Sequence, residues 1–166
     1  MATFILPHFG PLDSADLEEY YDVDIPFNNT TIQIDLNFDG KTIDPEKLET
    51  VKHFIDNIRI HDINNKKHIA NDYNDENADT VQFYVQHHLE ELGTAELAAL
   101  LPRGSKPADH KKLLLQKLHL VRVGIYPGSA SKFATFDYSI GREITDQLVV
   151  LCTDENGNLD YITMES

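Results

Sequence analysis

The sequence predicts an α+β fold. We expect an N-terminal β-hairpin, a helical middle and C-terminal antiparallel strands, forming a mainly antiparallel sheet with helices packed on one face. Apolar and polar residues alternate within residues 1–40 and again within 118–164, as they do in strands. Between these segments, in residues 44–117, apolar residues recur at helical spacing. A chain of 166 residues has the usual size of one domain, so we expect a single domain over residues 1–166.

The N-terminal segment is predicted to contain a short strand and one helical turn. Residues 3–6 form an apolar, β-like run that stops at Pro7. Residues 13–20 can form a turn of helix, because Asp13 or Ser14 can cap its first amide groups.

A β-hairpin follows, and its register can be derived from the alternation. Asn28 and Asn29 separate two alternating segments, and asparagine readily adopts the positive φ angles of a tight turn. A two-residue turn at this place pairs Val23 with Ile34 and brings all the apolar side chains of the hairpin to one face.

The middle of the chain is predicted to be helical. Asp44 caps the first helix, and Pro45 occupies its first position. The expected helices are residues 44–58, a separate or kinked continuation through residue 69, residues 80–92 with Gly93 as the stop, residues 94–101, and one more helix before residue 118.

Four strands are predicted in the C-terminal part, at residues 118–126, 133–140, 148–152 and 159–164. The last two are joined through Asn156-Gly157, a pair that is typical of tight hairpin turns. The order of strands, helices and strands therefore supports the α+β class.

The charge of the chain is strongly negative and unevenly distributed. The formal net charge is −14. Residues 1–101 carry 20 Asp and Glu against 6 Lys and Arg, whereas residues 102–166 carry 8 of each kind. Such a field repels nucleic acids and anionic membranes and attracts cations or basic proteins. We therefore expect neither a nucleic-acid nor a membrane partner, and a basic protein partner is one explanation of the charge; simple solubility is the other.

The sequence also indicates a compartment. Cys152 is the single cysteine and lies in an apolar, strand-like run, which fits a reducing environment. The first ten residues lack the features of a signal peptide, and no apolar run reaches the length of a membrane span. We expect a cytoplasmic protein, and its oligomeric state stays open.

Three aspartates of the hairpin form the first candidate binding group. The predicted register places Asp22 opposite Asp35, with Asp24 one pair further along, on the face away from the apolar residues. Directly opposed like charges are destabilising. A bound cation or a basic partner would offset this cost, and on a fully solvated face screening would make it small.

A polar loop between two predicted strands forms the second candidate group. Arg142 and Asp146 lie in residues 141–147, together with Glu143 and Thr145. Loops that connect strands often carry binding residues, so Arg142 and Asp146 are candidates, although these residues are also common in turns.

A third group would serve a small ligand or a reaction. If a pocket lies between the sheet and the helices, its candidate lining residues are Tyr84, His88, Arg122, Asp137 and Tyr138. The sequence contains no nucleophile elbow, P-loop, glycine-rich dinucleotide turn or HExxH motif. The eight histidines and one cysteine also lack metal-ligand spacing. We therefore predict no catalytic residue, no metal ligand and no cofactor.

Five segments resemble a known family. Residues 6–10 (LPHFG), 20–23 (YYDV), 120–127 (LVRVGIYP), 136–141 (FDYSIG) and 145–150 (TDQLVV) together resemble a bacterial family of small acidic proteins catalogued as a domain of unknown function. The resemblance implies no established activity, cofactor or site residue. The family is loosely similar to immunity proteins, which neutralise toxins.

These observations favour a non-enzymatic, acidic protein-binding domain of the immunity type, which docks a basic partner through residues 1–101. Two other functions stay open. One is a small-ligand-binding protein or enzyme with a pocket between sheet and helices, and the other is a structural oligomer.

Overall fold

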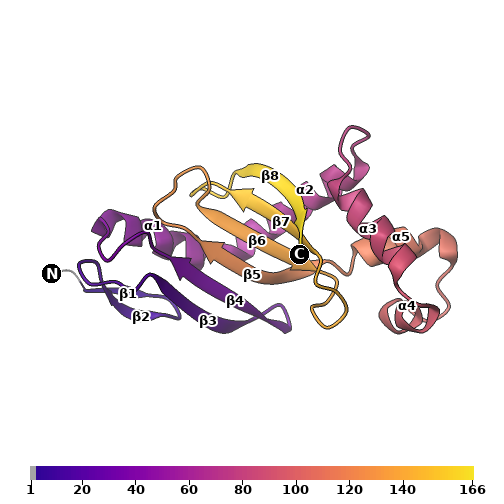
Figure 1. Ribbon diagram of the computed structural model, residues 1–166, viewed down its shortest axis with the longest axis horizontal. Coiled ribbons are helices and arrows are strands. Elements are labelled where there is room, and N and C mark those ends of the chain that lie inside the picture. The colour runs from indigo at the N-terminus through magenta and orange to yellow at the C-terminus, as the bar shows by residue number, and fades with distance from the viewer. Residues whose placement is uncertain (1–2) are drawn as a thin grey trace.

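The computed structural model describes residues 3–166 and confirms the α+β fold (Figure 1). The strands are β1 (Thr3–Leu6), β2 (Gly10–Asp13), β3 (Tyr20–Phe27), β4 (Thr30–Asn37), β5 (His119–Ile125), β6 (Ala134–Ser139), β7 (Leu148–Thr153) and β8 (Leu159–Glu165). The helices are α1 (Pro45–Asp56), α2 (Ile58–Asn74), α3 (Thr80–Glu91), α4 (Thr94–Leu100), the short 3-10 helix η1 (Pro107–Asp109) and α5 (His110–Leu115).

The central sheet has six strands in the order β3-β4-β5-β6-β7-β8. All neighbouring strands in it are antiparallel except β4 and β5, which are parallel. This exception has a simple cause: the chain leaves β4, forms all the helices and returns to the sheet at β5. Strands β1 and β2 form a separate two-stranded sheet.

The hairpin of β3 and β4 has the register that the sequence predicts. Val23 is paired with Ile34, and the turn residues Asn28 and Asn29 have φ angles of 47° and 65°. Ile34 is fully buried on the apolar face. The alternation and the turn chemistry together are thus sufficient to determine this element.

The helices cover one face of the sheet, and α1 and α2 lie behind it in Figure 1. Asp44 caps α1, because its side chain accepts a hydrogen bond of 3.0 Å from the amide of Glu46. The buried residues of α3 are Val81, Tyr84, Val85 and His88, which recur at helical spacing. These helices and the sheet enclose one continuous core.

The helical turn predicted for residues 13–20 is wrong. The chain instead forms β2, which pairs with β1, and then an irregular turn. Asp13 does bind a nearby backbone group, since its side chain accepts from the amide of Ala15 at 2.9 Å. Further along, the amide of Leu17 donates to the carbonyl of Lys41 at 2.8 Å, so a long-range bond takes the place of a helical one.

Helices α4 and α5 lie beyond one end of the sheet (Figure 1). Within residues 3–166, no helix combines the length and the apolar character needed to cross a membrane.

Candidate functional site

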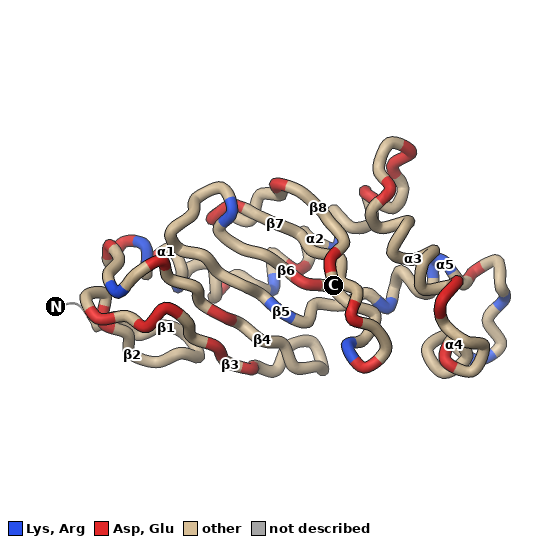
Figure 2. The backbone as a smooth tube through the Cα atoms, in the orientation of Figure 1, with Lys and Arg blue, Asp and Glu red and all other residues tan. Residues whose placement is uncertain are grey.

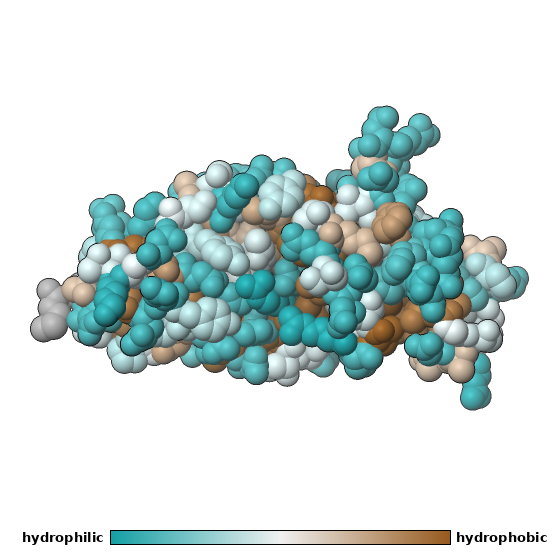
Figure 3. Space-filling model, viewed as in Figure 1, coloured by the Kyte–Doolittle hydropathy of each residue, from teal (hydrophilic) through white to brown (hydrophobic). Residues whose placement is uncertain are grey.

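The face of the sheet opposite the helices is open and carries a band of polar side chains. Because strand residues alternate between faces, this open face receives polar residues of β3, β4, β5 and β6, whereas β7 contributes the apolar Val150 and Cys152. The residues that matter below are Tyr20, Asp22, Asp24, Gln33, Asp35, Arg122, Gly124, Thr135 and Asp137. Figure 2 shows charged positions on β4, β5 and β6, and Figure 3 shows that hydrophilic residues predominate over the middle of this face.

An ion cluster lies at the centre of the open face. Nε and Nη2 of Arg122 donate to the two carboxylate oxygens of Asp35, at 2.6 and 2.9 Å, and Nη1 donates to Asp137 at 3.2 Å. Asp35 is 0% exposed although no helix covers this face. The guanidinium group of Arg122 itself therefore covers this carboxylate.

In this cluster, burial and the neighbouring charges shift the pKa values of Arg122 and Asp137 in opposite directions. Burial would lower the pKa of Arg122, but hydrogen bonds to Asp35 and Tyr126 and the two nearby carboxylates raise it overall. Burial raises the pKa of Asp137, although the positive charge of Arg122 opposes that shift. Arg122 thus stays protonated and is fully engaged within the protein.

Gly124 makes room for this arrangement. A Cβ atom at position 124 would lie 2.7 Å from Nη2 of Arg122 and 3.0 Å from Oγ1 of Thr135. Asn37 completes the surroundings, because its amide donates to Asp35 at 2.7 Å. The lack of a side chain at position 124 therefore lets the guanidinium group lie against β5.

A hollow of about 460 Å³ lies beside the cluster, and we call it the acidic hollow. It brings together three residues predicted as candidates from separate segments of the sequence, namely Asp22, Asp24 and Arg142. The complete lining is Asp22, Asp24, Thr30, Thr31, Ile32, Gln33, His119, Val121, Arg142 and Glu143. Its carboxylates outnumber its one arginine.

The carboxylates of the acidic hollow form no ion pair with a Lys or Arg of residues 3–166. Among residues 3–166, the Lys and Arg side chains that form ion pairs do so with Asp35, Asp62 and Asp137. Asp22 instead accepts a hydrogen bond of 3.2 Å from the side-chain amide, Nε2, of Gln33. The hollow thus has more negative than positive charge, and Arg142 offsets only part of it.

The predicted candidates Asp35 and Asp146 lie outside the acidic hollow. Asp35 is paired with Asp22 in the strand register, but its charge is neutralised by Arg122. Asp146 is exposed further along its loop and does not line the hollow.

Tyr84 of α3 holds both ends of the loop that carries Arg142 and Glu143. Its hydroxyl accepts from the amide of Ile140 at 3.2 Å and donates to the carbonyl of Gln147 at 3.1 Å. Tyr84 is therefore a positioning residue for the acidic hollow, from the opposite side of the sheet.

His88 fixes the middle of the same loop. Its Nδ1 lies 2.7 Å from the carbonyl oxygen of Tyr84, and its Nε2 lies 2.8 Å from the hydroxyl of Thr145. A carbonyl oxygen only accepts, so Nδ1 carries the hydrogen and Nε2 accepts from Thr145. Burial lowers the pKa of His88, which favours this neutral form.

The five residues expected to line a pocket between sheet and helices do not meet in one. Tyr84, His88 and Tyr138 are packed in the helix-covered core, where each is at most 2% exposed. Arg122 and Asp137 lie on the open face. Asp137 and Tyr138 are neighbours on one strand, and neighbours point to opposite faces, so the two cannot share a pocket.

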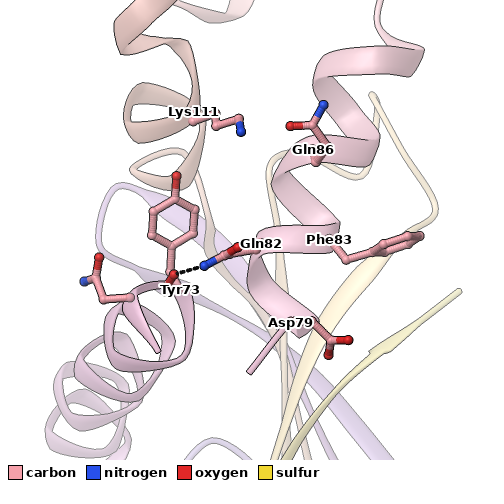
Figure 4. A pocket seen from close by; sticks show the side chains of 7 residues that line it. Tyr73, Asp79, Gln82, Phe83, Gln86 and Lys111 are labelled. Carbon is pink, nitrogen blue, oxygen red and sulfur yellow. Dashed lines mark hydrogen bonds between the residues drawn. The ribbon is translucent and has the colours of Figure 1, made fainter. Parts of the chain in front are cut away.

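The largest hollow, of about 620 Å³, lies between α2, α3 and α5 (Figure 4). Gln82 donates a hydrogen bond to the carbonyl of Tyr73, whose ring reaches toward Lys111. Its lining mixes amides, aromatic rings, one acid and one lysine, and it does not gather groups of one chemical kind.

Sequence reasoning did not select two residues that shape the site. Glu143 was recognised only as part of a polar loop, and Gly124 had no local signal. The contact of Gly124 with Arg122 depends on the side-chain conformation above β5, which the pattern of residues does not contain.

The comparisons with known proteins found no matching family model, no matching curated protein and no matching solved structure. Within residues 3–166, His, Cys, Asp and Glu side chains do not gather in any group of three or more that could hold a metal ion.

Proposed function

We propose that this protein is a non-enzymatic binding protein that docks a basic protein partner on the open face of its sheet. The observation that carries the proposal is the acidic hollow, where Asp22, Asp24 and Glu143 line one cavity with a single arginine, Arg142, and form no ion pair with Lys or Arg within residues 3–166. A lysine or arginine side chain of the partner would supply the missing charge.

The surroundings of the hollow support this proposal. Arg122 lies next to it but is occupied by Asp35 and Asp137, so it does not neutralise the hollow. The net charge of −14 adds a long-range field that accelerates encounters with basic proteins. Association should therefore become slower as the salt concentration rises.

The proposal extends to an immunity-type role in the cytoplasm, in which the partner would be a basic toxin. The resemblance of five sequence segments to a family of small acidic proteins supports this role, and the single cysteine, Cys152, supports a reducing compartment.

A titration followed by NMR tests the proposal. Tetralysine and tetraarginine peptides serve as probes, and we expect the amide signals of Asp22, Gln33 and Arg142 to shift. The double variant Asp22→Asn/Asp24→Asn should bind about three- to tenfold more weakly, because two exposed ion pairs are lost.

The matched control is Asp75→Asn/Glu76→Gln, which removes the same charge from the exposed loop between α2 and α3. It should bind the peptides as the unmodified protein does. Equal losses in both double variants would show that only the overall charge matters and would refute a site in the hollow. Calorimetry with Ca²⁺ and Mg²⁺ separates a metal cation from a basic side chain as the occupant.

A further inference from the structure

The edge of the sheet that β8 forms lies away from the acidic hollow and is a separate candidate surface. Strand β8 is the last strand in the sheet order, and within residues 3–166 it pairs with β7 alone. Figure 1 shows β8 along the margin of the sheet, with no further strand beyond it. Backbone N–H and C=O groups on the outer side of such a strand can pair with another strand.

The two edges of the sheet differ in how they are protected. Strand β3 contains Pro26, which has no N–H, and the exposed charges Asp22 and Asp24. Prolines and charges in an edge strand discourage strand addition. Strand β8, with the sequence LDYITME, also has two exposed charges, Asp160 and Glu165, and its pairing with β7 skips Asp160. It contains no proline, however, so each of its residues keeps its N–H group, and Tyr161 in it is 41% exposed. The β8 edge is the more permissive one for an added strand.

The charge along this edge has one sign. Residues 102–166 are neutral in sum, but their eight Lys and Arg all lie in residues 103–142. The hairpin of β7 and β8, residues 148–166, contains four acids, Asp154, Glu155, Asp160 and Glu165, and no Lys or Arg. Lys132, which lies outside this hairpin, places its Nζ 5.8 Å from the centre of the Tyr161 ring of β8.

We propose that β8 accepts an extended, basic segment of a partner protein as an additional strand. Main-chain hydrogen bonds would supply affinity, and lysine or arginine side chains beside Asp160 and Glu165 would supply specificity. A second copy of this chain is the less suitable occupant, because each copy carries a net charge of −14. This inference goes beyond the proposed function, since the acidic hollow lies at the opposite side of the sheet.

Three synthetic decapeptides test the proposal. The first alternates lysine and valine, the second alternates glutamate and valine, and the third alternates lysine and proline, so that it keeps the charge but cannot form a strand. Fluorescence anisotropy measures the binding, and hydrogen exchange locates it. The measurement uses the Asp22→Asn/Asp24→Asn variant, in which binding at the acidic hollow is weakened. We expect the lysine–valine peptide to bind this variant most tightly and to slow exchange of the amides of β8.

The double variant Asp160→Lys/Glu165→Lys should bind the lysine–valine peptide roughly tenfold more weakly, because two attractive pairs become repulsive. The matched control, Asp75→Lys/Glu76→Lys, changes the net charge equally in the exposed loop between α2 and α3 and should bind as the unmodified protein does.

Three results would overturn the proposal. Equal binding of the lysine–valine and lysine–proline peptides would show that charge alone acts. Absence of protection in β8 would exclude strand addition there. Protection of β8 that grows with protein concentration, together with a dimer in light scattering, would identify a second copy as the occupant. Because the Asp22→Asn/Asp24→Asn variant leaves β8 unchanged, failure of this proposal and failure of the acidic hollow can be told apart.

Discussion

The two faces of the central sheet both bury an aspartate, but different parts of the molecule bury it. On the helix-covered face, Asp62 of α2 is 2% exposed and accepts a hydrogen bond of 2.6 Å from the hydroxyl of Tyr138. On the open face, Asp35 is 0% exposed beneath the guanidinium group of Arg122. The first carboxylate is buried between two layers of secondary structure, whereas the second is buried on an open face, where the side chains of Arg122 and Asn37 donate to it.

The two buried aspartates therefore have different roles: Asp62 holds a helix against the sheet, and Asp35 belongs to the uncovered face. The bond of Tyr138 to Asp62 joins a helix to the sheet and is enclosed by core residues. The cluster around Arg122 pairs the charges of the open face but leaves that face accessible. The Arg122 side chain remains 26% exposed, and the acidic hollow lies next to it. A face that is polar, ordered and uncovered is suited to a partner.

The largest expected effect comes from removing the guanidinium group. Arg122→Met should destabilise the protein by about 3–5 kcal/mol, because Asp35 and Asp137 would remain buried without a counter-charge. Urea unfolding measures the loss. The difference from the unmodified protein should shrink at acidic pH, where protonation neutralises Asp137, whose pKa burial raises. Lys132→Met, at an exposed position, should change stability little; an equal loss there would contradict the special role of Arg122.

A smaller effect is expected when the space above β5 is filled. Gly124→Ala should cost about 1–3 kcal/mol, since the new methyl group would displace the guanidinium group. Thermal unfolding checks this. Gly40→Ala is the control, because no atom lies within 4 Å of a Cβ at that position. Equal stabilities of the two variants would show that the cluster adapts without cost.

The two hydrogen bonds by which Tyr84 holds the loop of Arg142 and Glu143 can be tested by a substitution on the helix-covered face. Tyr84→Phe should cost about 1–3 kcal/mol, because the Ile140 amide and the Gln147 carbonyl lose their partner. Hydrogen exchange at Ile140 should become faster. Tyr73→Phe removes a hydroxyl that forms no hydrogen bond among residues 3–166 and should leave this exchange unchanged. Unaltered exchange at Ile140 in the Tyr84 variant would show that the Tyr84 hydroxyl does not hold this loop.

The smallest effect concerns pH. Burial lowers the pKa of both His61 and His88, so the unfolded chain takes up these protons more readily than the folded one. Stability should therefore be complete above about pH 6.5 and fall as the pH drops below it, by about 1.4 kcal/mol for each unit of pKa difference. Urea titrations at pH 7.5 and 5.5 measure the fall. His61→Gln should reduce it, and an unchanged fall would remove His61 from the explanation.

The local elements could be predicted because their causes are local. The hairpin follows from alternation and from Asn28-Asn29, and α1 follows from Asp44 and Pro45 next to a periodic apolar stripe. Strand β2 was missed because Asp13 indicated a helix cap. In the structure the same side chain stabilises a turn, and both uses rely on the same short-range hydrogen bond.

The candidate site could be predicted only in part. The hairpin register brings Asp22 and Asp24 to the open face, but the arrival of Arg142 beside them depends on the tertiary fold. The pairing of Asp35 with Arg122 joins residues 87 positions apart, across the parallel contact of β4 and β5. Nothing in the neighbourhood of either residue signals this contact, so Asp35 was assigned to the interaction surface instead of to the ion cluster.

The parallel contact of β4 and β5 also has a consequence for the time course of folding. The β3–β4 hairpin and the β5–β8 meander each assemble from segments adjacent in the chain, whereas joining them requires closure of the long helical segment between. Closing long loops is slow because the chain loses entropy before the contact forms. We therefore expect the two parts of the sheet to form first and to associate late, with the Arg122–Asp35 bond as one of the last native contacts to appear.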